Sequence, residues 1–278
     1  MRLCPAELQQ RYREGRLLPF VGAGISMSVE WDDHGITRRG ISWSELVAEA
    51  GKKLGFQDPS LLRVRGTDLQ ILEYFRIKNK GHFASLNYWL KDVMGAPDSA
   101  LQNAPIHQRL AKMTGCQIFY TTNFDDFLER SFQLNGRAVR VVATEHDMGK
   151  PATATEIVKF HGDLDNPDHM VLSEKHYEER LALATPMDYR FRSDLLGRAV
   201  LFIGYSFRDY NVSYLFRLIN DHFGGLPLTP NGRRAYIVVE QPSDFELQLF
   251  SARNIEIIPV RRGALTSEIS ELLDELVS

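Results

Sequence analysis

Apolar runs alternate with amphipathic segments along the chain, and this alternation predicts strands separated by helices. Short, almost wholly apolar runs predict buried strands at Leu17–Val21, Cys116–Thr121, Ala138–Val142, Ile157–Phe160, Met170–Leu172, Ala199–Gly204, Ala235–Glu240 and Ile255–Val260. Strands that are apolar on both faces are typical of parallel sheets covered by helices. The chain is therefore expected to form a doubly wound, Rossmann-like α/β sheet.

The segment between the first two predicted strands is longer than a crossover requires. Ser42 and Glu45 have the spacing of a capping box and predict a helix start. Helical patterns then cover 43–54, Asp68–Asn79, Phe83–Met94 and Ile106–Met113. Because a crossover needs only a dozen or so residues, we expect a single domain over 1–278 with a helical insertion at approximately 43–113.

The polar stretch Trp31–Gly40 precedes this insertion and has two interpretations. It is long for a simple connection, so it is either a solvated loop or a functional lid. As a lid, it would bring Arg38 and Arg39 over a phosphate group.

Composition narrows the class of protein. The 278 residues include 44% hydrophobic residues and carry a net charge of -3, which gives no general attraction to nucleic acid or to anionic membranes. The sequence has no apolar run near the roughly 20 residues of a membrane span and no signal-peptide core, so we expect a cytoplasmic protein. Cys4 and Cys116 are too few for a zinc site built from thiolates and are expected to be small buried residues.

Residues with useful chemistry follow several predicted strands, where parallel α/β sheets bind ligands. They are Gly22, Ala23, Gly24 and Ser26 after the first strand, Asn123 and Asp125 after the second, His161, then Gly204 and Ser206, and finally Glu240. The glycines form either a plain tight turn or a turn that admits a pyrophosphate to the backbone. Ser26 either caps the following helix or bonds the ligand.

The remaining candidates also have two interpretations each. Asn123 and Asp125 are either helix caps or a polar pair at the mouth of a site. His161 is either a structural residue or a base that takes a proton from a hydroxyl or water. The pair Gly204 and Ser206 is either a capped turn or a place where ribose or phosphate approaches. Glu240 either accepts ribose hydroxyls or is an ordinary acidic residue at a strand end.

Taken together, these stretches resemble the sirtuin family. GAGIS at 22–26 is similar to that family's phosphate loop, TTNFD at 121–125 to its TQNID, FHG at 160–162 to its catalytic histidine-glycine, and GYSF at 204–207 to its GTSL. The resemblance implies that Asn123 orients the nicotinamide ribose, that Asp125 lines the nicotinamide pocket and that His161 is the general base. It further implies that Gly22, Ala23, Gly24, Ser26, Gly204 and Ser206 hold the pyrophosphate and adenosine half, with Glu240 at the adenosine ribose.

Two departures from the family direct the functional prediction. The four zinc-binding cysteines of the deacylases are missing, because 162–203 contains no cysteine, and the PDFR stretch is missing as well. SWSEL at 42–46 and HGDLDNPDHMVLSEKHYEE at 161–179 instead resemble bacterial sirtuin-like domains of antiphage defence systems. Those relatives resemble NAD+ glycohydrolases, which implies that NAD+ is the substrate, that no metal is used, and that nicotinamide and ADP-ribose are released.

Two other functions remain open from the sequence. The same residues would serve a non-catalytic subunit that binds NAD+ or ADP-ribose, and a protein deacylase is the less favoured alternative because the zinc cysteines are absent. The family resemblance implies a homo-oligomer or a separate regulatory partner, such as a ring-forming ATPase or an Argonaute-like subunit. We expect neither a membrane nor a direct nucleic-acid partner.

Overall fold

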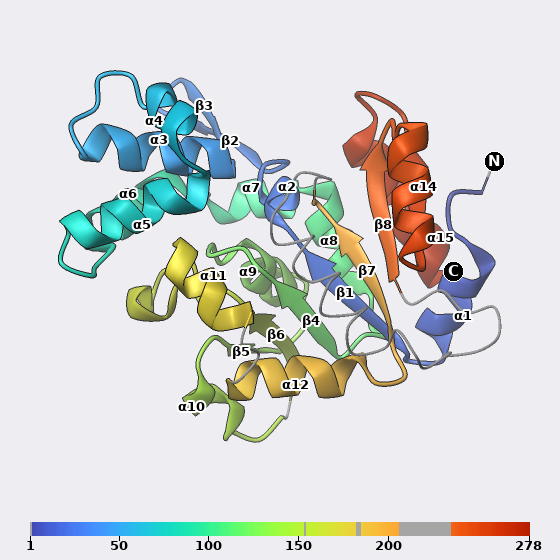
Figure 1. The fold of residues 1–278 in the computed structure, drawn as a ribbon. Helices are drawn as coiled ribbons and strands as arrows, with labels where there is room; N and C mark the ends of the chain where they lie inside the picture. The colour runs from blue at the N-terminus through green and yellow to red at the C-terminus, as the bar shows by residue number, and fades with distance from the viewer. Residues whose placement is uncertain (1, 153, 182–184, 206–234) are drawn as a thin grey trace.

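The computed structural model describes residues 2–152, 154–181, 185–205 and 235–278 (Figure 1). Its main sheet has the strand order β5-β6-β4-β1-β7-β8-β9, and the recorded pairings between these strands are parallel. The strands are β1 (Leu17–Val21), β4 (Ile118–Thr121), β5 (Val139–Val142), β6 (Thr155–Lys159), β7 (Ala199–Ile203), β8 (Ala235–Glu240) and β9 (Ile255–Val260). The predicted α/β fold with a parallel sheet is confirmed.

The order of the strands defines where a ligand should bind. On one side of β1 the sheet continues with β4, β6 and β5, in which β6 follows β5 in the chain but lies between β5 and β4; the other side of β1 holds β7, β8 and β9. Without the edge strand β5, this is the 3-2-1-4-5-6 order of dinucleotide-binding sheets. Neighbouring strands β1 and β7 therefore flank the switch point, where the connections diverge and leave a crevice beyond the carboxyl ends.

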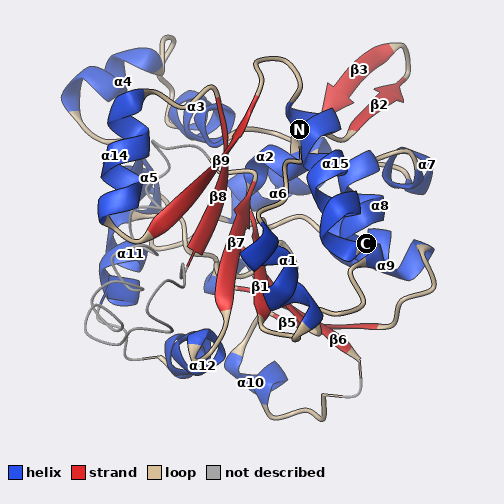
Figure 2. Ribbon diagram, turned by 90° about the vertical axis from the view of Figure 1, so that its right-hand side faces the viewer, coloured by secondary structure: helices blue, strands red, loops and turns tan. Residues whose placement is uncertain are grey.

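Helices cover both faces of the sheet, because successive side chains of a strand point to opposite faces. On β1, Leu17 and Val21 pack into one core, whereas Leu18 and Phe20 pack into the other. The first core is closed by α1 (Ala6–Arg13), α8 (Pro105–Lys112), α9 (Phe127–Leu134) and α15 (Leu265–Val277). The second is closed by α12 (Pro186–Leu195) and α14 (Asp244–Ala252). Figure 2 shows these two groups on opposite sides of the strands.

The segment between β1 and β4 is mainly helical, and all but its last helix, α8, lies beyond the carboxyl ends of the strands (Figure 1). Its helices are α3 (Trp43–Lys53), α4 (Ser60–Arg65), α5 (Asp68–Lys78), α6 (Ala84–Val93) and α7 (Asp98–Gln102), followed by α8. The predicted capping box is confirmed, since Ser42 Oγ accepts from the Glu45 N–H and the Glu45 side chain accepts from the Ser42 N–H. Helix α11 (Glu174–Leu181) packs beside α5. The assignment of this segment as an insertion within one domain stays a prediction.

The stretch Trp31–Gly40 is not the loop that its polarity predicts. Strands β2 (Glu30–Asp33) and β3 (Ile36–Arg39) form an antiparallel hairpin, with positive φ angles of 54° at His34 and 82° at Gly35. Two consecutive residues with positive φ are typical of the tight turns that match the twist of a hairpin. Trp31 is buried against Phe127, and their ring centroids are 6.1 Å apart. The hairpin is therefore anchored to the main body through its aromatic residue.

The predicted strand at Met170–Leu172 is wrong. This run follows the 3₁₀ turn η1 (Pro167–His169) and belongs to neither sheet. Met170 and Leu172 are buried in a cluster formed largely by helices α3, α5 and α6. A short apolar run shows that a segment is buried but does not show which kind of element will cover it. The described part of the chain also contains the short helices α2 (Ala23–Ser26) and α10 (Glu145–Met148).

Candidate functional site

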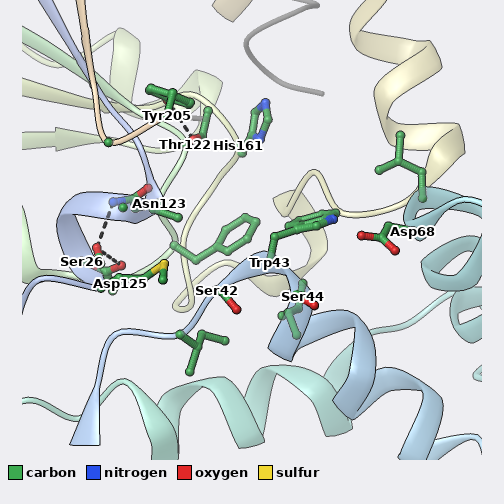
Figure 3. Close-up of a pocket in the computed structure, with 18 of the residues that line it drawn as sticks. Ser26, Ser42, Trp43, Ser44, Asp68, Thr122, Asn123, Asp125, His161 and Tyr205 are labelled. Atoms are coloured by element: carbon green, nitrogen blue, oxygen red, sulfur yellow. Dashed lines mark hydrogen bonds between the residues drawn. The ribbon is translucent and has the colours of Figure 1, made fainter. Parts of the chain in front are cut away.

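A pocket of about 1240 Å³ lies between the carboxyl ends of the strands and the helical segment (Figure 3). Eight predicted site residues line it: Ala23, Gly24, Ser26, Asn123, Asp125, His161, Gly204 and Glu240. Gly22 precedes Ala23 at the end of β1 but is not part of the lining, and Ser206 lies outside the described residues. The strand-end residues therefore reach one cavity even though they are up to about two hundred positions apart.

Glycines allow the two loops at the switch point to touch. The Gly22 N–H donates to Ile203 O at 2.8 Å, and the Gly24 N–H donates to Gly204 O at 2.9 Å. A Cβ on Gly22 or Gly24 would lie 2.7 or 2.9 Å from that Gly204 oxygen. Gly204 has a φ of +81°, and a Cβ there would lie 2.6 Å from Ile25 Cγ1. Packing between the loops thus requires these glycines, whether or not a pyrophosphate also approaches them.

Asn123 is held at the base of the pocket by a chain of hydrogen bonds. Its Nδ2 donates to Gly22 O at 3.1 Å and to Ser26 Oγ at 2.9 Å. Ser26 Oγ in turn donates to Asp125 Oδ2 at 2.8 Å, and Asp125 Oδ1 accepts from the Phe127 N–H at 3.1 Å. Figure 3 shows Ser26 and Asp125 on the side of Asn123 that faces away from His161. Ser26 and Asp125 therefore hold the Asn123 side chain in place.

The donors and acceptors in this hydrogen-bond network determine the orientation of the Asn123 amide. A hydroxyl has one hydrogen, and Ser26 uses it on the Asp125 carboxylate, so Ser26 can only accept from Asn123. A flipped amide would set its oxygen against the Gly22 carbonyl oxygen, without a hydrogen between them. The amide oxygen Oδ1 must therefore lie on the other side. There it is buried and has no hydrogen-bond partner among the described residues.

His161 is the second buried polar group without a partner at its reactive atom. It follows β6, packs face to face on Phe160 with ring centroids 5.8 Å apart, and meets the edge of Tyr177 at 5.4 Å. Within the described part of the chain, its Nε2 has no hydrogen-bond partner. Burial, with a further contribution from the Arg180 guanidinium, holds the pKa of His161 well below its usual range. The imidazole is therefore neutral at neutral pH, which is the form that accepts a proton.

The residue after His161 must be glycine because of the path of the chain. Gly162 has a φ of +79°, and a Cβ there would lie 2.6 Å from His169 O. His161 O also accepts from the Val171 N–H at 2.9 Å. The returning segment therefore passes directly over the histidine-glycine pair and shields it from solvent.

Tyr205 and Thr122 belong to the site although the sequence analysis did not single them out. The Tyr205 hydroxyl donates to Val21 O at 3.2 Å and lies 2.9 Å from Thr122 Oγ1. It joins the loops after β1, β4 and β7 across the switch point. Its position next to Gly204, at the end of the most apolar strand, is the feature that could have identified it.

Glu240 lines the pocket wall at the end of β8 and already has a structural partner. Its Oε1 accepts from the Gly263 N–H at 2.6 Å, which ties β8 to the loop before α15. One carboxylate oxygen is thus used within the protein. The predicted contact with a ribose hydroxyl would have to use the other oxygen.

Trp43, Asp68 and Tyr177 line the far side of the pocket, on the helical segment and α11. Asp68 there is paired with Arg63 through two hydrogen bonds of 2.7 and 3.1 Å.

The described residues contain no group of three or more His, Cys, Asp or Glu side chains that could hold a metal ion. In the same residues, no helix is both long and apolar enough to cross a membrane.

The two cysteines are buried and unpaired, as expected for small core residues. Burial raises the pKa of Cys4 to about 11 and that of Cys116 to about 12. Neither thiol is therefore a nucleophile at neutral pH.

The sequence model of the family described as SIR2-like domain matches residues 117–258. The NAD(+) hydrolase ThsA of Bacillus cereus (strain MSX-D12) is 24% identical over 276 residues, which are 92% of this chain and 53% of the relative. The NAD(+) hydrolase ThsA of Acinetobacter baumannii (strain 532279) is 27% identical over 213 residues, or 76% and 40% of the two chains. Defense-associated sirtuin 2 of Bacillus subtilis is 25% identical over 224 residues, or 78% and 20%.

The chain thus spans about half the length, or less, of these curated relatives. Among solved structures, a chain described under "Structural Basis for the Mechanism and Regulation of Sir2 Enzymes" is 13% identical. The similarity covers 98% of each chain with a TM-score of 0.44.

Proposed function

The chain belongs to the SIR2-like domain family, and from this premise we propose that it is an NAD+ glycohydrolase that depletes NAD+ in antiphage defence. The observation that carries the proposal is a pair of buried atoms, Asn123 Oδ1 and His161 Nε2, which have no hydrogen-bond partner among the described residues and belong to two residues that line one pocket. Buried polar atoms are nearly always hydrogen-bonded, so each such exception calls for an explanation. A substrate that supplies hydroxyl or water hydrogens to both atoms would explain them. The names of the relatives support NAD+ as that substrate.

The proposed reaction breaks the bond between the ribose C1′ and the nicotinamide nitrogen. The bonding electrons leave with nicotinamide, which becomes neutral, and an oxocarbenium-like ribose forms. Water then adds at C1′ and loses one proton, which gives ADP-ribose. Asn123 Oδ1 would accept from a ribose hydroxyl or the attacking water, and His161 Nε2 would take the proton. Because both atoms are shielded from solvent in the free protein, the substrate must displace neighbouring side chains to reach them.

The rest of the assignment concerns the other end of the dinucleotide. We propose that Ala23, Gly24 and Gly204 lie against the pyrophosphate and the adenosine half, with Gly22 behind them and Glu240 at the ribose. The adjacency of the two glycine loops at the switch point supports this. We also propose a cytoplasmic location, and restraint through homo-oligomerisation or a separate regulatory partner.

The test is to incubate the purified chain with NAD+ and to quantify nicotinamide and ADP-ribose by chromatography. His161→Ala and Asn123→Ala should stop the release of both products. His107→Gln is a matched control, because His107 is also fully buried but does not line the pocket. Unchanged release by the two site variants in a folded preparation would contradict the assignment.

One observation favours the alternative, a subunit that binds NAD+ or ADP-ribose without turnover. The low pKa of His161 disfavours the protonated state that a general base must pass through. A calorimetric titration with NAD+ separates the two functions. Binding without product release would favour the alternative over an unrestrained glycohydrolase, whereas removal of the acyl group from an acyl-lysine peptide would indicate a deacylase.

A further inference from the structure

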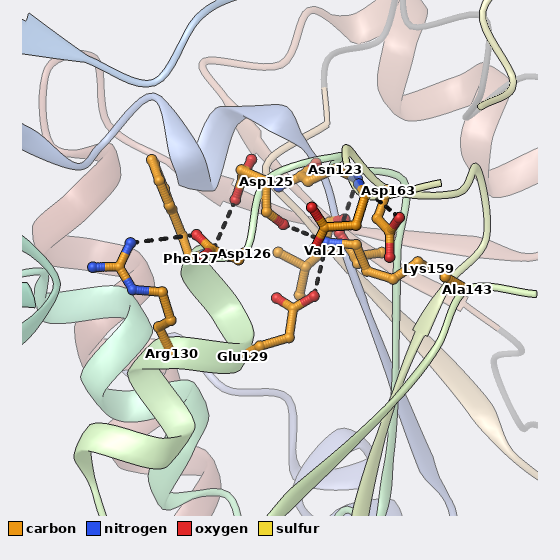
Figure 4. Close-up of polar contacts among 12 residues, drawn as sticks. Val21, Asn123, Asp125, Asp126, Phe127, Glu129, Arg130, Ala143, Lys159 and Asp163 are labelled. Carbon is orange, nitrogen blue, oxygen red and sulfur yellow. Dashed lines mark hydrogen bonds and ion pairs between the residues drawn. The ribbon is translucent and has the colours of Figure 1, made fainter. Parts of the chain in front are cut away.

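A buried lysine lies behind the pocket, at the end of strand β6. Lys159 is 1% exposed, and its Nζ lies 2.8 Å from Glu129 Oε1 on α9. The same ammonium group donates to the backbone oxygen of Asp125. Figure 4 shows Lys159 between these two partners. Lysine and glutamate are almost never fully buried unless they are paired. Each of these two side chains can therefore be buried here because the other is its partner.

The ammonium group of Lys159 stays charged in this position. Burial opposes protonation, but the Glu129 and Asp125 carboxylates outweigh it and raise the pKa of Lys159 above its usual value. A charged group without water must satisfy its hydrogens within the protein. The Asp125 oxygen and the Glu129 carboxylate provide two of the three acceptors that an ammonium group can use.

The lysine joins two segments where the sheet no longer holds them together. The last paired residues of β4 and β6 are Thr121 and Lys159, and the Phe160 N–H donates to Thr121 O at 2.8 Å. Beyond this point, Asn123 follows β4 and His161 follows β6. The Lys159 side chain reaches forward across the gap to Asp125. It thus ties the loop of one reactive residue to the strand of the other.

A continuous path leads from Lys159 to the Asn123 amide. Lys159 holds the Asp125 backbone, the Asp125 carboxylate accepts the Ser26 hydroxyl hydrogen, and Ser26 accepts from Asn123 Nδ2. A shift of Asp125 would free the Ser26 hydroxyl to turn. The amide of Asn123 would then lose one of the two acceptors that orient it, and only the Gly22 oxygen would still keep Oδ1 on the side of His161.

We propose that Lys159, held by Glu129, is a positioning residue that fixes the loop at 122–126 and thereby the Asn123 amide relative to His161. Its effect on turnover rests on the proposed function, whereas its effect on the loop does not. Neither Lys159 nor Glu129 lines the pocket, so both act through other residues.

The test compares three variants of the full chain. Lys159→Met removes the ammonium group and leaves Glu129 buried without its partner. The double variant Lys159→Met/Glu129→Leu removes both charges, and replacing a buried ion pair by apolar groups of similar volume is often neutral or stabilising. Glu156→Gln is the matched control, because it breaks a buried ion cluster at the opposite end of β6, away from the pocket.

Three measurements are made on each variant: thermal unfolding, hydrogen exchange of the peptide covering 122–127, and the kcat and KM for nicotinamide release. In the double variant we expect a melting temperature near that of the wild type, faster exchange at 122–127 and a kcat reduced by about 100-fold, the loss that a misplacement of about 1 Å can cause. KM should change less than kcat, because the pocket wall is intact. Glu156→Gln should lower the melting temperature with exchange at 122–127 and kcat unchanged.

A double variant with wild-type stability, exchange and kcat would overturn the proposal, since the pair would then serve folding alone. If the wild type alone releases no nicotinamide, the isolated chain is not an unrestrained glycohydrolase, and the exchange measurement alone still decides the positioning role. Slow, wild-type-like exchange at 122–127 in the double variant would refute that role in either case.

Discussion

Strand β6 carries a buried charge cluster at each end, and the two clusters serve the molecule differently. Near its start, Glu156 is paired with Arg140 of β5 and with Arg190 of α12. At its end, Lys159 is paired with Glu129 of α9. Glu156 and Lys159 are three positions apart, so their side chains point to opposite faces of the sheet. One strand thus holds an ion cluster in each of the two layers.

The difference lies in what surrounds each cluster. Around Glu156 the network continues through Arg190 to Asp194 at 3.4 Å, and Asp194 accepts from the Tyr120 hydroxyl at 2.8 Å. These residues connect β4, β5, β6 and α12, and none of them lines the pocket. Around Lys159 the network ends at Asn123, whose Oδ1 has no partner within the described residues. The first cluster joins elements of the fold, whereas the second ends at an atom without a described partner, on a residue that lines the pocket.

The largest loss of activity is expected when the side chains of His161 and Asn123 are removed. His161→Ala and Asn123→Ala should each lower kcat for nicotinamide release by about 10²–10⁴-fold, the range for a lost acid–base group. Asn123→Ala should also lower the free energy of unfolding by about 1–3 kcal/mol, because the hydrogen bonds from Nδ2 to Gly22 O and Ser26 Oγ are lost. Single-turnover kinetics on NAD+ with urea denaturation in parallel would measure both effects. A variant that unfolds at lower urea but turns over normally would contradict the assignment.

Variants that break either the Lys159 cluster or the Glu156 cluster should lose similar amounts of stability but should differ in activity. Lys159→Met and Glu156→Gln should each lower the free energy of unfolding by about 3–5 kcal/mol, because each removes one side of a buried ion pair. Only Lys159→Met should also lose turnover in its folded fraction. Equal losses of turnover, measured at matched folded protein concentration, would mean that the two ends of β6 do not differ in role.

Two histidines of the described residues, His107 and His161, are fully buried, and His107 extends the comparison to pH. Burial lowers the pKa of His107 to about 4, whereas the unfolded chain titrates near 6.5. Between these values the unfolded state binds a proton that the folded state does not, so the contribution of His107 to stability is full above pH 6.5 and is lost as pH falls toward 4. The loss is about 3 kcal/mol. In His107→Gln, denaturation between pH 7 and 4 should show a shallower decline, and an unchanged slope would refute this origin.

The smallest difference in stability is expected between alanine variants of two glycines that have similar backbone angles. Gly204 and Gly136 have φ values of +81° and +72°, but only at Gly204 would a Cβ meet other atoms, Ile25 Cγ1 at 2.6 Å being the nearest. Alanine should therefore cost about 1–3 kcal/mol more at Gly204 than at Gly136, because overpacking is added to backbone strain. Gly204→Ala should also raise the KM for NAD+. Equal unfolding free energies of the two variants would show that the loop accommodates the methyl group.

Much of the site could be predicted from local pattern. The strand ends at Val21, Thr121 and Phe160 are visible because each buried strand is a continuous apolar run that gives way to small or polar residues. Asn123 and His161 follow such ends directly, so the topology of a parallel sheet brings them to one edge. The same logic fails at Met170–Leu172, where an apolar run packs among helices, and at Trp31–Gly40, where polar residues form a hairpin.

The sequence by itself determined the parallel sheet, the glycine turns and the identity of the residues at the strand ends, because these depend on local apolar pattern and on backbone freedom. Only the tertiary structure decided the partners: that Lys159 meets Glu129 and Asp125, that Ser26 gives its hydrogen to Asp125, and that no other described residue pairs with Asn123 Oδ1 or His161 Nε2. Hydrogen bonds and ion pairs depend on positions in space to within a few tenths of an ångström. Residues far apart in the chain reach such positions only when the whole sheet and its helices have packed.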